Sequence, residues 1–126
     1  MQRFFASCLV VAGLLYLFLM TTYLAVPISA QDLDHAKRQA REALAAGAEM
    51  LELRTDYLDA LRPDSVTALI TAVREAGRGR APVIVTCRDP REGGARPYAG
   101  ELRMQVLLAA VEAGADFIDL EYANFI

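Results

Sequence analysis

Short apolar runs alternate with longer amphipathic segments from residue 23 onward. Four of the runs have the length and the β-branched or alternating residues that are typical of strands. They cover Tyr23–Ile28, Met50–Asp56, Val83–Val85 and Phe117–Glu121. The third run follows Pro82 and is too short for a helix, so we expect a strand buried in the core. The pattern therefore predicts strands separated by helices.

Three segments between these strands place apolar residues at the spacing of one helix face. We expect Ser29 to cap the first helix, which stops at Gly47. The second helix opens at Pro63 and ends near Gly77, and the third ends at Gly114. Their apolar positions are Leu33, Ala36, Ala40, Ala43 and Leu44, then Val66, Leu69, Ile70 and Val73, then Leu102, Val106, Ala109, Ala110 and Ala113.

Strand and helix alternate regularly, and residues 46–53 (Ala-Gly-Ala-Glu-Met-Leu-Glu-Leu) recur in similar form as residues 113–120 (Ala-Gly-Ala-Asp-Phe-Ile-Asp-Leu). This repetition favours a (β/α) array with parallel strands and right-handed crossovers. A (β/α)8 TIM barrel needs about 250 residues, and the chain has 126. We therefore predict an α/β protein of TIM-barrel type, truncated to a half barrel of about four β/α units.

An almost wholly apolar segment, Phe4–Met20, precedes this array, with Arg3 as its flanking charge. It resembles the core of a signal peptide or a marginal transmembrane helix. Cleavage after Ala30 would remove the first strand, however, and Met20 offers another start for translation. We divide the chain into an apolar N-terminal extension over residues 1–19, signal-like, membrane-like or a mis-assigned start, and a β/α domain over residues 20–126.

Composition narrows the class of partner. The formal net charge is -3 and the basic residues are scattered, so we expect no nucleic acid among the partners. Cys8 and Cys87 have neither metal-ligand spacing nor a disulfide framework, which fits a reducing compartment. We therefore expect a cytoplasmic protein, and the cysteines indicate no metal site. Membrane anchoring through residues 4–20 is the alternative.

Polar residues gather at the carboxyl ends of the predicted strands. In a (β/α) barrel these ends meet at one mouth, where active sites lie. The residues that we expect there are Ser29, Glu52, Arg54, Asp56, Arg88, Glu92 and Glu121. Guanidinium and carboxylate groups can bind a hydroxylated, carboxylated small molecule. The alternation in the second strand predicts instead, as an alternative, a row of ion pairs formed by Glu52, Arg54 and Asp56.

The loop after the third strand is charged and contains Gly93–Gly94. Two glycines allow the backbone to turn with positive φ or to approach another group closely. A charged glycine loop at the exit of a strand seldom serves packing alone. We therefore expect Arg88 and Glu92 to be functional.

Three motifs follow one another in the chain: Glu52-Leu-Arg54-x-Asp56, Thr86-Cys-Arg88 with Glu92-Gly93-Gly94, and residues 114–121. Together they resemble the type I 3-dehydroquinate dehydratases of the shikimate pathway, over about Tyr23 to Ile126. The resemblance implies a (β/α)8 lyase of aromatic amino acid biosynthesis, which dehydrates 3-dehydroquinate to 3-dehydroshikimate through a lysine Schiff base, without a metal. A histidine shuttles the protons in that family.

The same resemblance implies roles for particular residues. Glu52, Arg54 and Arg88 correspond to substrate-binding positions, and Glu92 corresponds to the carboxylate that orients the histidine. We add Ser29 as a substrate-binding candidate because it lies at the end of the first predicted strand.

The family's lysine and histidine lie on later strands than this chain contains. The chain's one histidine, His35, and its one lysine, Lys37, both fall on the first predicted helix, so we assign them no catalytic role. We therefore expect a fragment or truncated gene product that is inactive alone. A shikimate dehydrogenase domain in a longer gene and a homodimer of the full-length form are left open.

Two other functions are kept as alternatives. A membrane-anchored, non-catalytic half-barrel module has its support in residues 1–20 alone. Another (β/α)8 enzyme, which binds a phosphorylated small molecule, is disfavoured because the sequence contains no P-loop or GxGxxG pattern. Phosphate sites in barrels, however, usually come from the later strands.

Overall fold

Four parallel strands form the sheet of the computed structural model, which describes residues 22–125. The strands are β1 (Ala25–Ile28), β2 (Met50–Arg54), β3 (Val83–Thr86) and β4 (Phe117–Asp119), and they lie in the order β1-β2-β3-β4. Each neighbouring pair is parallel. The predicted parallel array is therefore confirmed, whereas the predicted apolar extension over residues 1–19 lies outside the described residues.

Strands β1, β2 and β4 are shorter than the apolar runs that predict them, whereas β3 extends one residue beyond its run, to Thr86. Leu24 precedes β1, and its carbonyl accepts hydrogen bonds from the amides of Glu49 and Met50. β2 ends at Arg54, where the chain turns into a short 3-10 helix, η1 (Thr55–Tyr57). The Thr55 hydroxyl donates to the carbonyl of Thr86 at 3.0 Å. This bond holds the turn after β2 against the end of β3.

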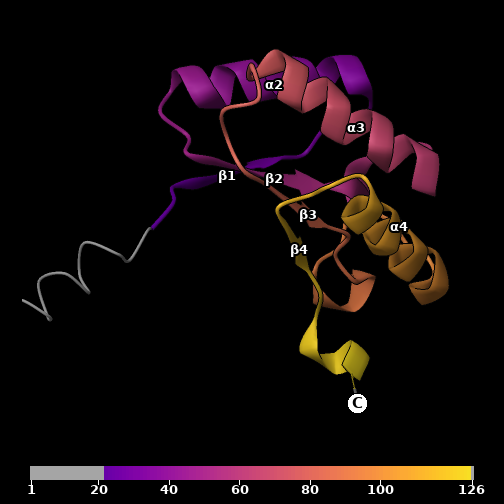
Figure 1. Cartoon of the computed structure of the whole chain (residues 1–126). Helices are drawn as coiled ribbons and strands as arrows, with labels where there is room; N and C mark the ends of the chain where they lie inside the picture. The colour runs from indigo at the N-terminus through magenta and orange to yellow at the C-terminus, as the bar shows by residue number, and fades with distance from the viewer. Residues whose placement is uncertain (1–21, 126) are drawn as a thin grey trace, which may run out of the picture.

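Three helices connect the strands and lie along one side of the sheet (Figure 1). They are α2 (Leu33–Ala45), α3 (Pro63–Ala76) and α4 (Gly100–Glu112), and α3 packs between the other two. Right-handed crossovers between successive parallel strands place helices on the same face of a sheet. Within residues 22–125, no helix has the length and apolar character that crossing a membrane requires.

The core lies between the sheet and this helical layer. Leu51, Leu53, Val83 and Val85 point toward the helices, and none is more than 2% exposed. The helical side chains buried in the same cluster are Ala36, Ala40, Val66, Leu69, Ile70, Val73, Val106, Leu107 and Ala110. Because side chains alternate along a strand, the residues between these core positions lie on the other face, which the three helices leave uncovered.

Asp32, and not Ser29, caps α2. The Asp32 carboxylate accepts from the amide of His35 at 2.8 Å, three residues into the helix. Ser29 follows β1 directly, and its amide donates to the side-chain oxygen of Gln39 at 2.9 Å. The prediction that Ser29 caps the helix is therefore wrong, because the chain needs further residues to pass from the sheet to the helical layer.

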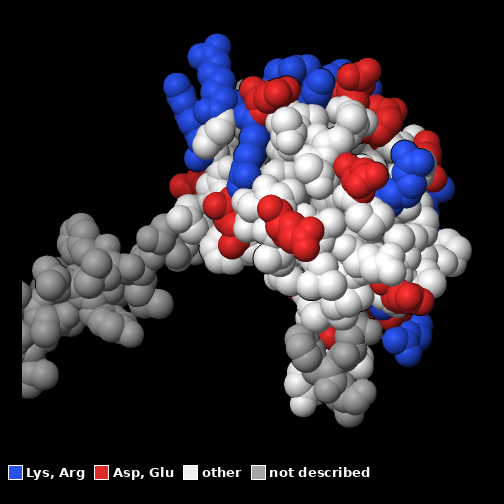
Figure 2. All heavy atoms as spheres, turned by 45° about the vertical axis from the view of Figure 1, so that its right-hand side comes forward, with Lys and Arg blue, Asp and Glu red and all other residues white. Residues whose placement is uncertain are grey.

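Apolar side chains are also exposed on the outward side of α4 and on β4. Met104, Leu108 and Val111 lie on α4, and Phe117 and Ile118 lie on β4. Figure 2, which brings this side of the molecule forward, shows a broad uncharged surface. The helix is therefore apolar on more than the single face that the sequence predicts.

Candidate active site

The uncovered face of the sheet carries the polar residues that the sequence predicts for a site. The strand register places Glu52 beside Ile84 and Arg54 beside Thr86. On the next strand, Asp119 lies beside Thr86. Residues in register on parallel strands point to the same face. Glu52, Arg54 and Asp119 therefore share one face, toward the carboxyl ends of the strands.

Asp56 joins three segments at these strand ends. Arg54 donates from Nε and Nη2 to the two carboxylate oxygens of Asp56, at 2.9 and 2.8 Å. The same carboxylate accepts from the amides of Arg88, at 3.4 Å, and Ala95, at 2.9 Å. Asp56 is fully buried, so each of these donors offsets part of the cost of burying its charge. The side chain therefore links the turn after β2 to two points of the loop after β3, Arg88 and Ala95.

The ionised form of Asp56 is favoured although the side chain is buried. Burial raises the pKa of this carboxyl, but the bonds from Arg54 and from the amide of Ala95 outweigh it, so the pKa lies below its usual range. Glu52, in contrast, is half-buried and makes no hydrogen bond or ion pair with residues 22–125. The predicted row of three ion-paired residues is therefore wrong, because Arg54 pairs with Asp56 and no ion pair joins Glu52 to either of them among the described residues.

The Arg88 guanidinium lies beside two carboxylates. Its Nη2 donates to Asp119 at 2.9 Å, and its Nε lies 4.0 Å from an oxygen of Glu121. The Nε is buried and has no hydrogen-bond partner among the described residues. Arg88 is thus held in place at the end of β3 while part of its donor capacity stays unused.

A buried group of charges supports this end of the sheet. Arg103, on α4, donates to Asp89 at 2.7 Å and to Glu121 at 3.3 Å, and the side chains of all three are at least nine-tenths buried. Arg103 also donates to the carbonyl of Cys87 at 3.2 Å, and the amide of Asp89 donates to Glu121 at 2.6 Å. The group ties α4 to the ends of β3 and β4.

Arg103 is not among the residues that the sequence predicts for the site. Its signal is its place in the helix, because Arg103, Val106, Leu107 and Ala110 follow the spacing of one helix face and all are buried. A charged residue on an otherwise apolar face is a sign of a buried partner. The predicted apolar positions Val106 and Ala110 are confirmed as part of that face.

The carboxylates of this group are stabilised as anions. Hydrogen bonds from the side chain and amide of Arg91, together with the charge of Arg103, hold the pKa of Asp89 at about 2. Burial raises the pKa of Glu121, but the hydrogen bond from the Asp89 amide and the charge of Arg103 lower it by more, so the pKa lies below its usual value. Burial also raises the pKa of the Cys87 thiol, which therefore stays protonated at neutral pH.

Each of the two loop glycines shows one of the two predicted backbone features, a positive φ or a close approach to another group. Gly93 has a φ of 89°, which favours glycine. Gly94 passes so close to the preceding chain that a Cβ there would lie 2.2 Å from the carbonyl oxygen of Arg88. Between these glycines and Asp89, the side chain of Glu92 is exposed and makes no hydrogen bond or ion pair with the described residues.

His35 and Lys37 lie in the helical layer, on α2. The Nε2 of His35 is 3.0 Å from the side-chain nitrogen of Gln39, the residue that holds the backbone of Ser29. Both residues therefore belong to the opposite side of the sheet from Arg54 and Glu52. Neither residue therefore lies beside the polar side chains at the strand ends.

Comparison with known proteins relates the whole β/α unit to one enzyme family. The model of the family described as type I 3-dehydroquinase matches residues 24–125. A 3-dehydroquinate dehydratase of Methanothermobacter thermautotrophicus is 33% identical over 105 residues, which are 83% of this chain and 44% of that protein. One from Ignicoccus hospitalis is 36% identical over 105 residues, which are 82% of this chain and 45% of that protein.

Solved structures agree with this relation. The crystal structure of 3-dehydroquinate dehydratase from Geobacillus kaustophilus superposes with a TM-score of 0.76 at 26% identity, over 83% of this chain and 42% of that one. The enzyme from Enterococcus faecalis gives a TM-score of 0.71 at 26% identity, over 79% and 42% of the two chains. The chain therefore spans less than half the length of the relatives that it matches.

The parallel sheet, its single layer of helices and its charged strand ends define an α/β protein that matches part of a dehydroquinase TIM barrel. The chain belongs to the type I 3-dehydroquinase family. The resemblance seen in its three sequence motifs is thereby confirmed.

Proposed function

We propose that this chain forms the substrate-binding part of a 3-dehydroquinate dehydratase, a lyase that converts 3-dehydroquinate to 3-dehydroshikimate. The observation that carries the proposal is the arrangement at the strand ends. Arg54 and Arg88 are both anchored there by carboxylates and both keep unused donors. The family's relatives with the printed name 3-dehydroquinate dehydratase support the choice of substrate.

Each side chain at the strand ends has a part in this proposal. The guanidinium groups of Arg54 and Arg88 bind the oxygens of the substrate by charge-assisted hydrogen bonds. Glu52, which has no partner among residues 22–125, accepts from a substrate hydroxyl. Ser29 is a further candidate, since it is half-buried at the end of β1. The charge of Asp56 is taken up by Arg54, so Asp56 acts on the substrate only through that residue.

Glu92 is proposed to act on a second group and not on the substrate. In the proposed reaction a lysine forms a Schiff base with the ketone, and a histidine then moves a proton. A carboxylate beside that histidine fixes its tautomer and stabilises its charged form. Glu92 is exposed on the loop after β3, so its carboxylate is available to a histidine brought by another segment.

The chemistry needs groups that this chain does not place at the strand ends. Lys37 and His35 lie on α2, so we propose that the reacting lysine and histidine come from additional β/α units. The membrane-anchored module and the enzyme for a phosphorylated substrate, our two alternatives, are not favoured by the family membership. The cytoplasmic location and a homodimer of a longer form stay predictions.

A chimera tests the proposal. This chain replaces the matching part of the Methanothermobacter thermautotrophicus relative, and 3-dehydroquinate is added with borohydride, which reduces a Schiff base to a stable adduct. We expect dehydration and a mass adduct on a lysine of the relative's portion, and neither in this chain alone. A folded chimera that gives no adduct while the unmodified relative does, or an adduct on Lys37, would contradict the proposal.

A further inference from the structure

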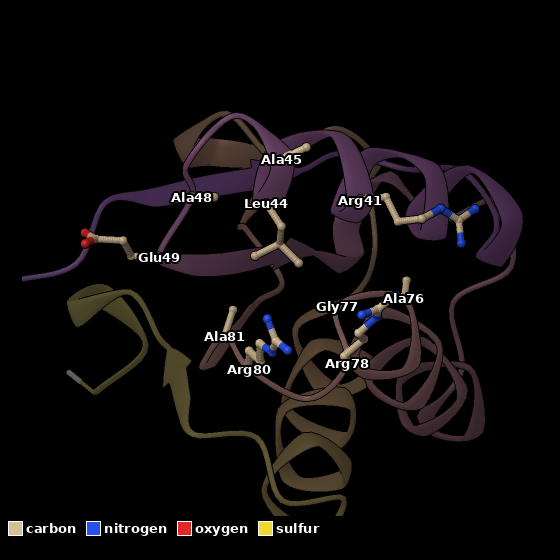
Figure 3. A pocket seen from close by; sticks show the side chains of 10 residues that line it. All are labelled: Arg41, Leu44, Ala45, Ala48, Glu49, Ala76, Gly77, Arg78, Arg80 and Ala81. Carbon is tan, nitrogen blue, oxygen red and sulfur yellow. The ribbon is translucent and has the colours of Figure 1, made fainter.

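A pocket of about 740 Å³ opens at the other end of the sheet from the candidate active site (Figure 3). It lies between the last turns of α2 and the loop that joins α3 to β3. Its lining includes Glu49 and Ala81, which come just before β2 and β3, whereas the candidate active site lies where these strands end. The pocket therefore shares no residue with that site.

The inner wall of the pocket is apolar. Leu44, Ala48, Ala76 and Ala81 line it and pack against the hydrophobic core. Figure 3 shows Leu44 pointing from α2 toward the loop. Gly77 permits this approach, because a Cβ there would lie 2.7 Å from Leu44 Cδ1. Small side chains around one leucine leave an apolar recess at the surface.

Three arginines line the rim of the same pocket. Arg41 extends from α2, and Arg78 and Arg80 lie on the loop side beneath Leu44 (Figure 3). Their guanidinium groups make no hydrogen bond or ion pair with residues 22–125. In Figure 2, basic side chains stand together at the upper left, over the ends of α2 and α3.

The carboxylate in the lining does not neutralise these arginines. Glu49 accepts a hydrogen bond from the amide of Leu24 at 2.7 Å. In Figure 3 it lies at the opposite end of the pocket from Arg78 and Arg80. Glu49 therefore forms no ion pair with Arg78 or Arg80.

The backbone of the loop sets the place of the two arginines. Arg78 has a φ of 55°, in the left-handed region that few residues other than glycine adopt. The amide of Arg78 donates to the carbonyl of Glu75 at 3.2 Å, and the amide of Gly79 donates to the carbonyl of Arg74 at 2.7 Å. Strained residues of this kind persist where their surroundings hold them, and they occur often at functional sites.

We propose that this pocket binds a small amphipathic anion, with a compact apolar body against the alanines and a carboxylate or phosphate group against Arg78 and Arg80. Guanidinium forks match both head groups. An apolar recess with a few converging polar groups is the usual form of a small-molecule site. Arginines near the end of a helix also interact favourably with its dipole, but that role requires neither a recess nor two guanidinium groups beside it.

The test is an NMR titration of the full chain with phenyl phosphate, and with benzoate in a second arm. We expect saturable shifts of the amides of Leu44, Gly77 and Arg80 with at least one of the two. Stronger binding of phenyl phosphate assigns a phosphate head group, and stronger binding of benzoate assigns a carboxylate. Replacing Arg78 and Arg80 together by glutamine should raise the dissociation constant at least tenfold.

Controls distinguish binding in the pocket from nonspecific electrostatic or hydrophobic binding elsewhere on the surface. Arg38→Gln removes an exposed arginine of α2 that does not line the pocket, so it should change the dissociation constant less than twofold. Ala76→Leu fills the recess and should abolish binding of both probes. This variant tests the proposed site if the double variant fails to fold. Equal binding of neutral benzyl alcohol, equal binding of inorganic phosphate, or unchanged binding in the folded double variant would overturn the proposal.

Discussion

Arg103 reaches from α4 to Asp89 across 2.7 Å, and both side chains are almost completely buried. The pair joins the helical layer to the loop that carries Arg88 and Glu92. Glu121, at the end of β4, shares the same guanidinium at 3.3 Å. The carboxyl ends of β3 and β4 are thus held together by one residue of the helix between them.

Removal of Arg103 should strongly destabilise the chain. Arg103→Met leaves Asp89 and Glu121 buried without their common cation, and breaking a buried pair in this way costs about 3–5 kcal/mol. Urea unfolding followed by circular dichroism measures the loss. Arg91→Gln is the matched control, since Arg91 also binds Asp89 but its side chain is 78% exposed, so we expect a clearly smaller loss of stability than in Arg103→Met. Equal losses in the two variants would contradict a special role for the buried arginine.

Stability should fall in acid because of Asp89. Its pKa is lowered from 3.8 to about 2, so the unfolded chain takes up the proton first as the pH decreases. The contribution is complete above the unfolded pKa and is lost as the pH falls toward the folded value. Asp89→Asn should therefore be less stable at pH 7, and its free energy of unfolding should converge with that of the wild type near pH 2. Parallel curves in urea unfolding from pH 7 to pH 2 would show that Asp89 is not responsible.

The two loop glycines should differ in their tolerance of alanine. Gly94→Ala would place a Cβ 2.2 Å from the carbonyl oxygen of Arg88, so the loop must move, at a cost of at least about 2 kcal/mol. At Gly93 there is open space, and only the positive φ opposes a side chain, at about 1 kcal/mol. Thermal unfolding of both variants tests this order. The reverse order would mean that the close approach at Gly94 does not restrict the loop.

Substitutions of Arg88 and Glu92 should change different kinetic constants of the active chimera. Arg88→Ala removes hydrogen bonds to a charged group worth about 1.5–3 kcal/mol and should raise KM about tenfold or more. Glu92→Gln should leave KM nearly unchanged, lower kcat, and shift the pH profile of kcat by lowering the pKa of the histidine beside it. Steady-state kinetics between pH 5 and pH 9 would distinguish the two. A raised KM with an unchanged kcat and pH profile in Glu92→Gln would make Glu92 a substrate ligand.

Hydrophobic periodicity predicts most of this fold, because burial of one helix face and of alternate strand residues leaves a direct mark on the sequence. Leu51 and Leu53 in β2, and Val66 to Val73 in α3, are core residues for that reason. The start of α2 is less visible, since Ser29 and Asp32 are both good caps and only the path from sheet to helix selects Asp32.

The site is only partly visible in the sequence, for a related reason. Strand alternation correctly places Glu52 and Arg54 on one face, but it does not tell which charges pair, and Arg54 turns to Asp56 in η1 instead of to Glu52. Arg103 is hidden because a charged residue within a helix normally faces solvent. Its partners, Asp89 and Glu121, come from distant parts of the chain, and only the three-dimensional structure brings them together.

The bidentate bond between Arg54 and Asp56 also has a consequence for the selectivity of a ligand site. A free arginine loses its rotational freedom when it binds, at about 0.5–1.5 kcal/mol per ordered side chain. Arg54 is already held through Nε and Nη2 and lies 5.1 Å over the ring of Tyr57. If Arg54 binds the substrate as proposed, the ligand therefore meets a guanidinium that is already ordered by contacts within the protein. Molecules whose acceptor atoms match the orientation of this guanidinium gain the hydrogen bond without the cost of ordering Arg54, whereas other molecules must change their own conformation to form it.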